Sequence, residues 1–188
     1  MADSLRALRR PIHAVDIGAN VGLFGVFLLE LFPDAEVTAF EPDRANAAVH
    51  RHVIRENERE RSWRLRTACA SNANGWLPFR GDDFSGSSIV ADHEADAAER
   101  ARSEDVMDLL AGADLVKIDA EGGEWALLTD PRLHDVSARA FVLEYHPHLC
   151  PGDDPRGLAE SLLAAAGYTT ANLFHRADGV GMLWAWRP

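Results

Sequence analysis

The chain has 188 residues, of which 47% are hydrophobic and 26% charged, as is typical of one globular domain with a sizeable core. Its formal net charge of −11 disfavours nucleic acid and anionic membrane surfaces as partners. No stretch approaches the roughly 20 apolar residues that a membrane-spanning helix needs, and the start lacks the apolar segment of a secretory signal. Cys69 and Cys150 lie beside apolar residues, which favours buried free thiols and a cytoplasmic location.

The first third of the chain alternates short apolar runs with helical patterns. Residues 1–11 form a short extension, because Pro11 ends any helix before it. Asp43 suits the N-cap of the helix expected at 43–59. In order, we expect a strand at 13–18, a buried helix at 22–32, a strand at 36–40, an amphipathic helix at 43–59 and a strand at 63–70.

The remainder continues this alternation after a polar interruption. Residues 76–80 resemble a short edge strand, and 81–103 are rich in Gly, Ser, Asp and Ala. Residues 76–103, including Ser85, Ser87 and Ser88, are either a flap over a site or a loose surface loop. We then expect a helix at 104–110, a strand at 113–119, a helix at 124–130, a strand at 139–145, a helix at 157–167 and a terminal hairpin over 168–186.

Strands separated by helices indicate a parallel sheet with helices on both faces. Since no linker or repeat divides the chain, we expect one domain over residues 1–188. The fold class is therefore α/β: a Rossmann-like, doubly wound, mostly parallel sheet of about seven strands with one antiparallel C-terminal strand. Ligands bind such sheets outside the carboxyl ends of the strands. The loops there span 16–22, 41–43, 70–75, 119–124 and 144–150, and most carry carboxylates, amides or histidine.

The first of these loops reads "VDIGANVG". Gly18 and Gly22 permit a tight turn from strand to helix with close approach of a ligand, and Asn20 adds hydrogen-bonding groups. The spacing differs from the dinucleotide pattern G-x-G-x-x-G, so a ligand bearing a carboxylate and an amine suits this turn better than a pyrophosphate. A turn without a ligand is the alternative.

Glu41 follows the second strand, nineteen positions after Gly22. An acidic side chain about 20 residues beyond a glycine turn can accept hydrogen bonds from both hydroxyls of an adenosine ribose. We therefore expect Glu41 to bind a ribose, although an exposed acid at a strand end is the alternative.

Five motifs occur together in the order seen in one known family: "VDIGANVG", "FEPD", "SGSSIV", "DLVKIDAEGGEW" and "VLEYHP". Between about residues 13 and 148 the chain strongly resembles FkbM-type proteins, which are class I AdoMet-dependent methyltransferases. "KIDAEGGE" is the most specific of these motifs. The chain differs from the family in its compactness, with almost nothing before the first strand.

The resemblance implies S-adenosyl-L-methionine as cofactor and a small hydroxylated molecule, such as a sugar or a polyketide-like natural product, as acceptor. It implies a place for each binding residue. Asp16, Gly18, Asn20 and Gly22 would contact the methionine moiety, Glu41 the ribose with Pro42 nearby, Ala70 and Ser71 the adenine, and Asp119 the methyl and amino groups.

A hydroxyl acceptor must lose a proton as its new bond forms, so a base is expected. His146 is the first candidate, because it follows the fifth strand and neutral imidazole is the usual base near pH 7. A surface or capping histidine is the alternative, and Asp119 and Glu121 are further catalytic candidates.

Lys117 lies within a strand that should be buried on both faces. A buried ammonium needs an acidic partner, so we predict a pair with Asp16 or Glu144 on the neighbouring strands. We expect no metal ion, because no close spacing in the sequence demands one. The group Asp119, Glu121, Glu144 and His146 leaves Mg²⁺ or another divalent ion as the alternative.

Two other functions remain open. An NAD-dependent oxidoreductase could use the same glutamate, although the dinucleotide pattern is missing. A cofactor-binding module without a catalytic base is the non-enzymatic alternative. The compactness of the chain also suggests an open site, which a bulky acceptor or a homodimer would complete.

Overall fold

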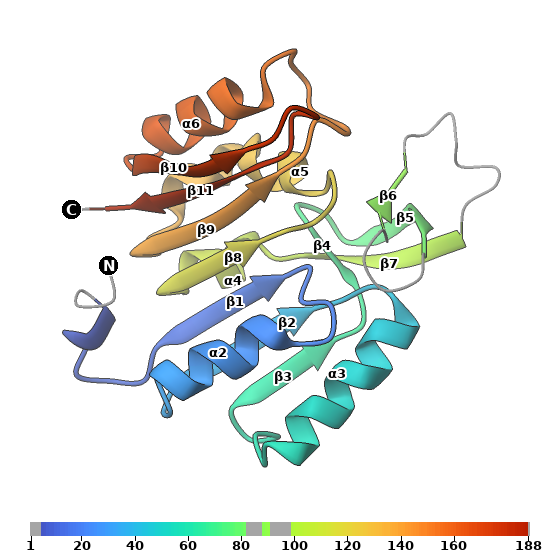
Figure 1. Ribbon diagram of the computed structural model, residues 1–188, viewed down its shortest axis with the longest axis vertical. Coiled ribbons are helices and arrows are strands. Elements are labelled where there is room, and N and C mark those ends of the chain that lie inside the picture. The colour runs from blue at the N-terminus through green and yellow to red at the C-terminus, as the bar shows by residue number, and fades with distance from the viewer. Residues whose placement is uncertain (1–4, 82–87, 91–98, 188) are drawn as a thin grey trace.

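The computed structural model describes residues 5–81, 88–90 and 99–187, and these residues form two sheets (Figure 1). The larger sheet has seven strands in the order β10-β11-β9-β8-β1-β2-β3. Its strands are β1 (His13–Ile17), β2 (Glu36–Phe40), β3 (Trp63–Arg66), β8 (Leu115–Ile118), β9 (Ala140–Tyr145), β10 (Thr169–His175) and β11 (Gly181–Trp186). Strand β11 runs antiparallel to both neighbours, whereas β1 is parallel to β2 and β8, β2 to β3, and β8 to β9. The predicted Rossmann-like sheet with one antiparallel C-terminal strand is confirmed.

Helices cover both faces of this sheet (Figure 1). On one face, α2 (Leu23–Leu31) and α3 (Arg44–Glu56) pack on the β1–β3 half. On the other, α4 (Met107–Ala111), α5 (Glu124–Leu128) and α6 (Pro155–Ala165) enclose the larger apolar core, and a 3₁₀ turn, η2 (Pro131–Asp135), follows α5. Among the described residues, none of these helices is long and apolar enough to span a membrane.

Helix α3 begins where the sequence predicts, because Asp43 accepts hydrogen bonds from the backbone N–H groups of Ala45 and Asn46. Its buried side includes His50 and Ile54, one turn apart, which face the sheet.

Helix α2 corrects the prediction of a buried helix. Gly25, Leu28 and Leu29 are buried, but Leu23 and Phe27 are 74% and 64% exposed. Since a helix presents only one stripe to a sheet, the apolar residues on its opposite side stay exposed. Apolar composition alone does not distinguish such a helix from one that is covered on all sides.

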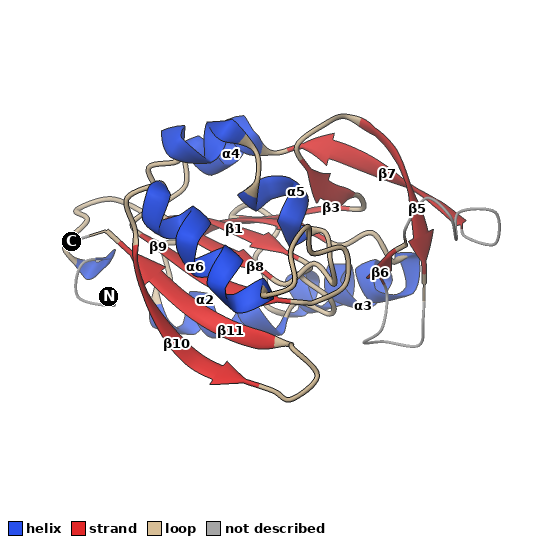
Figure 2. Cartoon of the chain, turned by 90° about the horizontal axis from the view of Figure 1, so that it is seen from above, coloured by secondary structure: helices blue, strands red, loops and turns tan. Residues whose placement is uncertain are grey.

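The second sheet was not predicted. It contains β4 (Cys69–Ser71), β5 (Gly75–Arg80), β6 (Ser88–Ile89) and β7 (Glu99–Asp105) in the order β4-β7-β5-β6. Figure 2 shows these strands at one end of the larger sheet, and in Figure 1 they lie beyond the carboxyl ends of its parallel strands. They supply a second wall at the edge where a ligand is expected.

This sheet overturns three expectations. The single strand predicted at 63–70 is two strands, β3 and β4, because the chain leaves the larger sheet after Arg66. Strand β5 is not an edge strand, since β6 and β7 flank it. Residues 99–105 form β7 rather than loop, so helix α4 begins at Met107 and not at 104. The rest of the predicted flap, 82–87 and 91–98 with Ser85 and Ser87, lies outside the described residues.

Gly25 tests the packing of α2 on the sheet. A Cβ atom there would lie 2.1 Å from Cζ2 of Trp63, a buried ring. Although alanine has the higher helix propensity, we expect Gly25→Ala to lower the free energy of unfolding by about 1–3 kcal/mol. At the control position Gly112, a Cβ atom would meet nothing closer than 3.8 Å, so Gly112→Ala should change the free energy of unfolding by less than about 0.5 kcal/mol. Urea denaturation measures this free energy for each variant. Equal stabilities of Gly25→Ala and Gly112→Ala would contradict the packing of α2 on Trp63.

Candidate functional site

A cavity of about 280 Å³ lies between the carboxyl ends of the parallel strands and the second sheet. Most of the predicted site residues line it, namely Gly18, Asn20, Glu41, Pro42, Ala70, Asp119 and Glu121. The other predicted residues lie around it. Asp16 is buried, Gly22 is the N-cap of α2, and Ser71 lines a neighbouring pocket. His146 lies next to Glu121 and Glu144, which line the cavity.

The glycine turn has the tight geometry that the sequence predicts. Gly18, Asn20 and Gly22 all have positive φ angles, of 69°, 48° and 93°. The backbone N–H groups of Gly18 and Ala19 donate to the carbonyl of Phe40 at 3.1 and 2.9 Å, which ties the turn to the end of β2. A Cβ atom on Gly18 would lie 1.6 Å from the backbone oxygen of Asp119, so only glycine fits there.

The buried ring of His50 packs against Gly22 of this turn, a contact that was not predicted. A Cβ atom on Gly22 would lie 2.6 Å from Cδ2 of the His50 ring. Burial lowers the pKa of His50 to about 4, so the imidazole is neutral at pH 7. The available signal was a histidine on the apolar stripe of α3, which sequence reasoning does not distinguish from a core residue.

Glu41 is held in place by backbone groups. One carboxylate oxygen accepts from the N–H of Asn20 at 2.8 Å, and the other accepts from the N–H of Asp43 at 2.9 Å. The side chain is buried, and this burial raises the pKa of the carboxyl group. Since a carboxylate offers about four lone-pair sites, the oxygens retain capacity toward the cavity.

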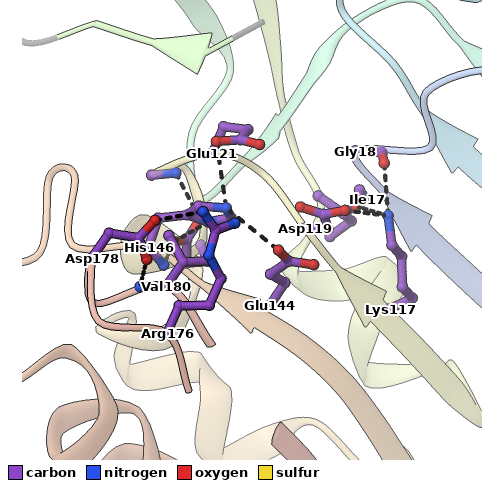
Figure 3. A network of polar contacts seen from close by, with 12 residues as sticks. Ile17, Gly18, Lys117, Asp119, Glu121, Glu144, His146, Arg176, Asp178 and Val180 are labelled. Carbon is purple, nitrogen blue, oxygen red and sulfur yellow. Dashed lines mark hydrogen bonds and ion pairs between the residues drawn. The ribbon is translucent and has the colours of Figure 1, made fainter. Parts of the chain in front are cut away.

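Lys117 joins the ends of β1 and β8 (Figure 3). The predicted pair with Asp16 is confirmed at 3.5 Å, and a second pair with Asp119 lies at 3.3 Å, whereas Glu144 forms no ion pair with the ammonium in the described structure. The ammonium also donates to the carbonyl of Gly18 at 2.7 Å. Burial alone would lower the pKa of Lys117, but the two aspartates together raise it.

His146 is surrounded by carboxylates. Its Nδ1 lies 3.1 Å from Glu124 Oε1, and the same oxygen accepts from its backbone N–H at 2.7 Å. Its Nε2 lies 3.4 Å from Glu121 and 4.0 Å from Glu144. Burial disfavours the charged ring, but the carboxylates, Glu124 foremost, raise the pKa of His146 to about 9. The ring is therefore protonated at pH 7, in contrast to the neutral imidazole expected from the sequence.

Several residues of the site were missed. Phe79 and Ile89 of the second sheet form part of the cavity wall, and the polar sequence around them carries no signal of it. Glu124, fully buried, also accepts from the N–H of Gly122 at 2.9 Å. In the sequence, Glu124 is the final glutamate of the motif "KIDAEGGE". Cys69 also lines the cavity as a free thiol, and burial raises its pKa to about 12.

Comparisons with known proteins identify the fold. No family model matches the chain, and no curated protein sequence matches it. Solved structures similar to it include an FkbM methyltransferase from Methylobacillus flagellatus (TM-score 0.65, 14% identity, 99% of this chain and 50% of that chain). Another is a precorrin-6y C5,15-methyltransferase from Geobacter metallireducens (TM-score 0.57, 16% identity, 99% and 85%). A third is TYW2 from P. horikoshii in complex with MeSAdo (TM-score 0.53, 14% identity, 100% and 62%). The chain thus spans about half the length of the FkbM structure, and the likeness to all three is one of fold.

Removing the charge of Lys117 tests its role. Asp16 is fully buried and accepts no hydrogen bond from the described residues, so Lys117→Met leaves a carboxylate without a counter-charge. We expect a loss of about 3–5 kcal/mol in the free energy of unfolding, and partial recovery when Asp16→Asn is added. Arg156→Met, which breaks a partly exposed pair with Glu160, is the control and should change stability little. Equal urea midpoints for Lys117→Met and Arg156→Met would rule out this role.

Proposed function

We propose that this protein is an AdoMet-dependent methyltransferase that transfers the methyl group of S-adenosyl-L-methionine to a hydroxyl group of a small molecule. The observation that carries the proposal is the convergence of the glycine turn, Glu41 and Asp119 on one cavity. That cavity lies at the carboxyl edge of a sheet whose structural relatives are methyltransferases. The FkbM-type motifs support the same cofactor and suggest a hydroxylated acceptor.

The cavity suits the parts of this cofactor. The methionine tail would lie on the turn at 18–22, where Gly18 and Asn20 line the cavity. The ribose hydroxyls would donate to Glu41, and the adenine would pack against Ala70, with Phe40 and Pro42 as further apolar walls. The sulfonium methyl group would then face Asp119.

Methyl transfer requires that the acceptor oxygen, the methyl carbon and the sulfur lie in line. The oxygen–carbon bond forms as the carbon–sulfur bond breaks, its electron pair stays on sulfur, and the acceptor proton leaves. Alignment of this kind can contribute about 7–11 kcal/mol. Glu121 is the proposed base, because its carboxylate lines the cavity and burial raises its pKa. His146 is a positioning residue in this proposal, since its ring is already protonated at pH 7.

Two alternatives make different demands. An NAD-dependent oxidoreductase would bind NAD⁺, and a non-catalytic module would bind S-adenosylmethionine without turnover. Incubation with methyl-labelled S-adenosylmethionine and a panel of hydroxylated metabolites should give a labelled product and S-adenosylhomocysteine. Binding of the cofactor without product over the whole panel would favour the module, and binding of NAD⁺ alone would favour the oxidoreductase.

Glu41→Gln tests the ribose site. The neutral amide accepts hydrogen bonds more weakly than the carboxylate, and its NH₂ group opposes the backbone N–H of Asn20 or Asp43. We expect affinity for S-adenosylhomocysteine to fall roughly ten- to a hundredfold in calorimetry. Glu36→Gln, at the exposed start of the same strand, is the matched control and should bind as the unmodified protein does. Equal affinities of the two variants would exclude ribose binding by Glu41.

A further inference from the structure

We propose that Asp119, Glu144 and His146 bind one divalent metal ion at the wall of the cavity. One ligand atom from each of the three residues lies within 4.8 Å of the others. Ligand atoms about 2.1 Å from a metal are separated by roughly 3–4 Å, so small rotations of the carboxylates complete the geometry. Asp119 is distant in the sequence from Glu144 and His146, and the parallel pairing of β8 and β9 brings the three residues together.

The imidazole is oriented as a metal ligand, and because only neutral imidazole coordinates a metal, the ion would replace the proton on Nε2. Glu124 holds Nδ1 and the backbone N–H of His146, so Nε2 points toward Glu121 and Glu144 (Figure 3). The His146 side chain is only 7% exposed, and its Nε2 lies 3.4 Å from Glu121 and 4.0 Å from Glu144. A ring nitrogen directed at carboxylates, with the other nitrogen fixed by a carboxylate, is the arrangement by which proteins orient metal-binding histidines.

The charge of the cluster favours a cation. Asp119, Glu121, Glu144 and Glu124 surround the ring, and the nearby ammonium of Lys117 already pairs with Asp16 as well as Asp119. Both carboxylate ligands line the cavity, at 32% and 23% exposure, so an ion can enter and retain open coordination positions. A donor set of two carboxylates and one imidazole suits Mn²⁺, and it also accepts Mg²⁺ or Zn²⁺.

The role of the ion rests on the proposed function. The acceptor hydroxyl would occupy an open coordination position beside the sulfonium methyl group. Coordination lowers the pKa of a bound hydroxyl, so its proton passes more readily to Glu121. The oxygen then forms the bond to the methyl carbon, while the sulfonium becomes a thioether. The ion is neither oxidised nor reduced, and no further reactant is needed.

Mn²⁺ provides the test, because its free form has a six-line EPR signal that is lost on binding. Titration of the metal-free protein without cofactor should show one tight site, and Mg²⁺ should compete for it. Asp119→Asn and Glu144→Gln should each weaken binding at least tenfold. Glu56→Gln removes an exposed carboxylate far along α3 and is the control, which should leave the tight site unchanged. Circular dichroism of each variant verifies that it is folded.

Three outcomes would overturn the metal site. The first is no tight site in the unmodified protein, and the second is Mn²⁺ binding by the Asp119→Asn and Glu144→Gln variants as tight as that of the unmodified protein. The third is a loss of Mn²⁺ affinity in Glu56→Gln as large as that in these two variants. A further variant, His146→Gln, applies if either carboxylate variant fails to fold. Failure of the proposed function gives a different result. If Mn²⁺ binds but S-adenosylhomocysteine does not, the metal site remains and the methyltransferase proposal falls. If S-adenosylhomocysteine binds and Mn²⁺ does not, the methyltransferase proposal remains and the metal site falls.

Discussion

The ammonium of Lys117 is the constraint on which the site depends. The Lys117 side chain is only 15% exposed between the ends of β1 and β8, where its ammonium pairs with Asp16, whose carboxylate oxygens accept no hydrogen bond from any described group. The same group holds the Gly18 carbonyl and pairs with Asp119, so one side chain fixes the positions of two loops. A lysine is costly to bury, and here the cost is offset by its pairs with Asp16 and Asp119.

The glycine turn and Glu41 are linked in the same way. The turn is hydrogen-bonded to the end of β2 through Phe40, and the N–H of Asn20 donates to the Glu41 carboxylate. A ligand that contacts Glu41 therefore meets a carboxylate whose position the turn already determines. His50 lies under Gly22 and fills the space that a side chain there would need. The cavity is thus preorganised by backbone geometry more than by long side chains.

The order of apolar runs and helices predicted most of the larger sheet, because buried parallel strands read as short hydrophobic runs. Lys117 was informative for the same reason, since one charge in such a run demands a partner. The second sheet could be predicted only in part. Residues 76–80 show the pattern of a strand and form most of β5, whereas β7 is made almost wholly of polar and charged residues, and the pairing of β5 with β7 joins residues far apart in the sequence. The break after Arg66 is likewise invisible, because the residues around it continue a strand-like pattern.

Within the site, residues that follow strands were predictable, because topology alone places Glu41, Asp119 and His146 at one edge. Their electrostatics were not. Whether His146 carries a proton depends on Glu124, which approaches from α5 and is buried with it. Cavity walls from the second sheet, such as Phe79, have no motif that marks them. The positions of Glu41, Asp119 and His146 after strands predicted that they lie together beside one cavity, but not the charge balance around them.

The decisive experiment is a crystal structure of the protein with S-adenosylhomocysteine. We expect the nucleoside to occupy the cavity, with its ribose hydroxyls in hydrogen-bonding distance of Glu41, its amino-acid tail over Gly18 and its sulfur near Asp119. Density for the ligand elsewhere on the chain, or an empty cavity at saturating ligand in crystals that leave its mouth open, would contradict it.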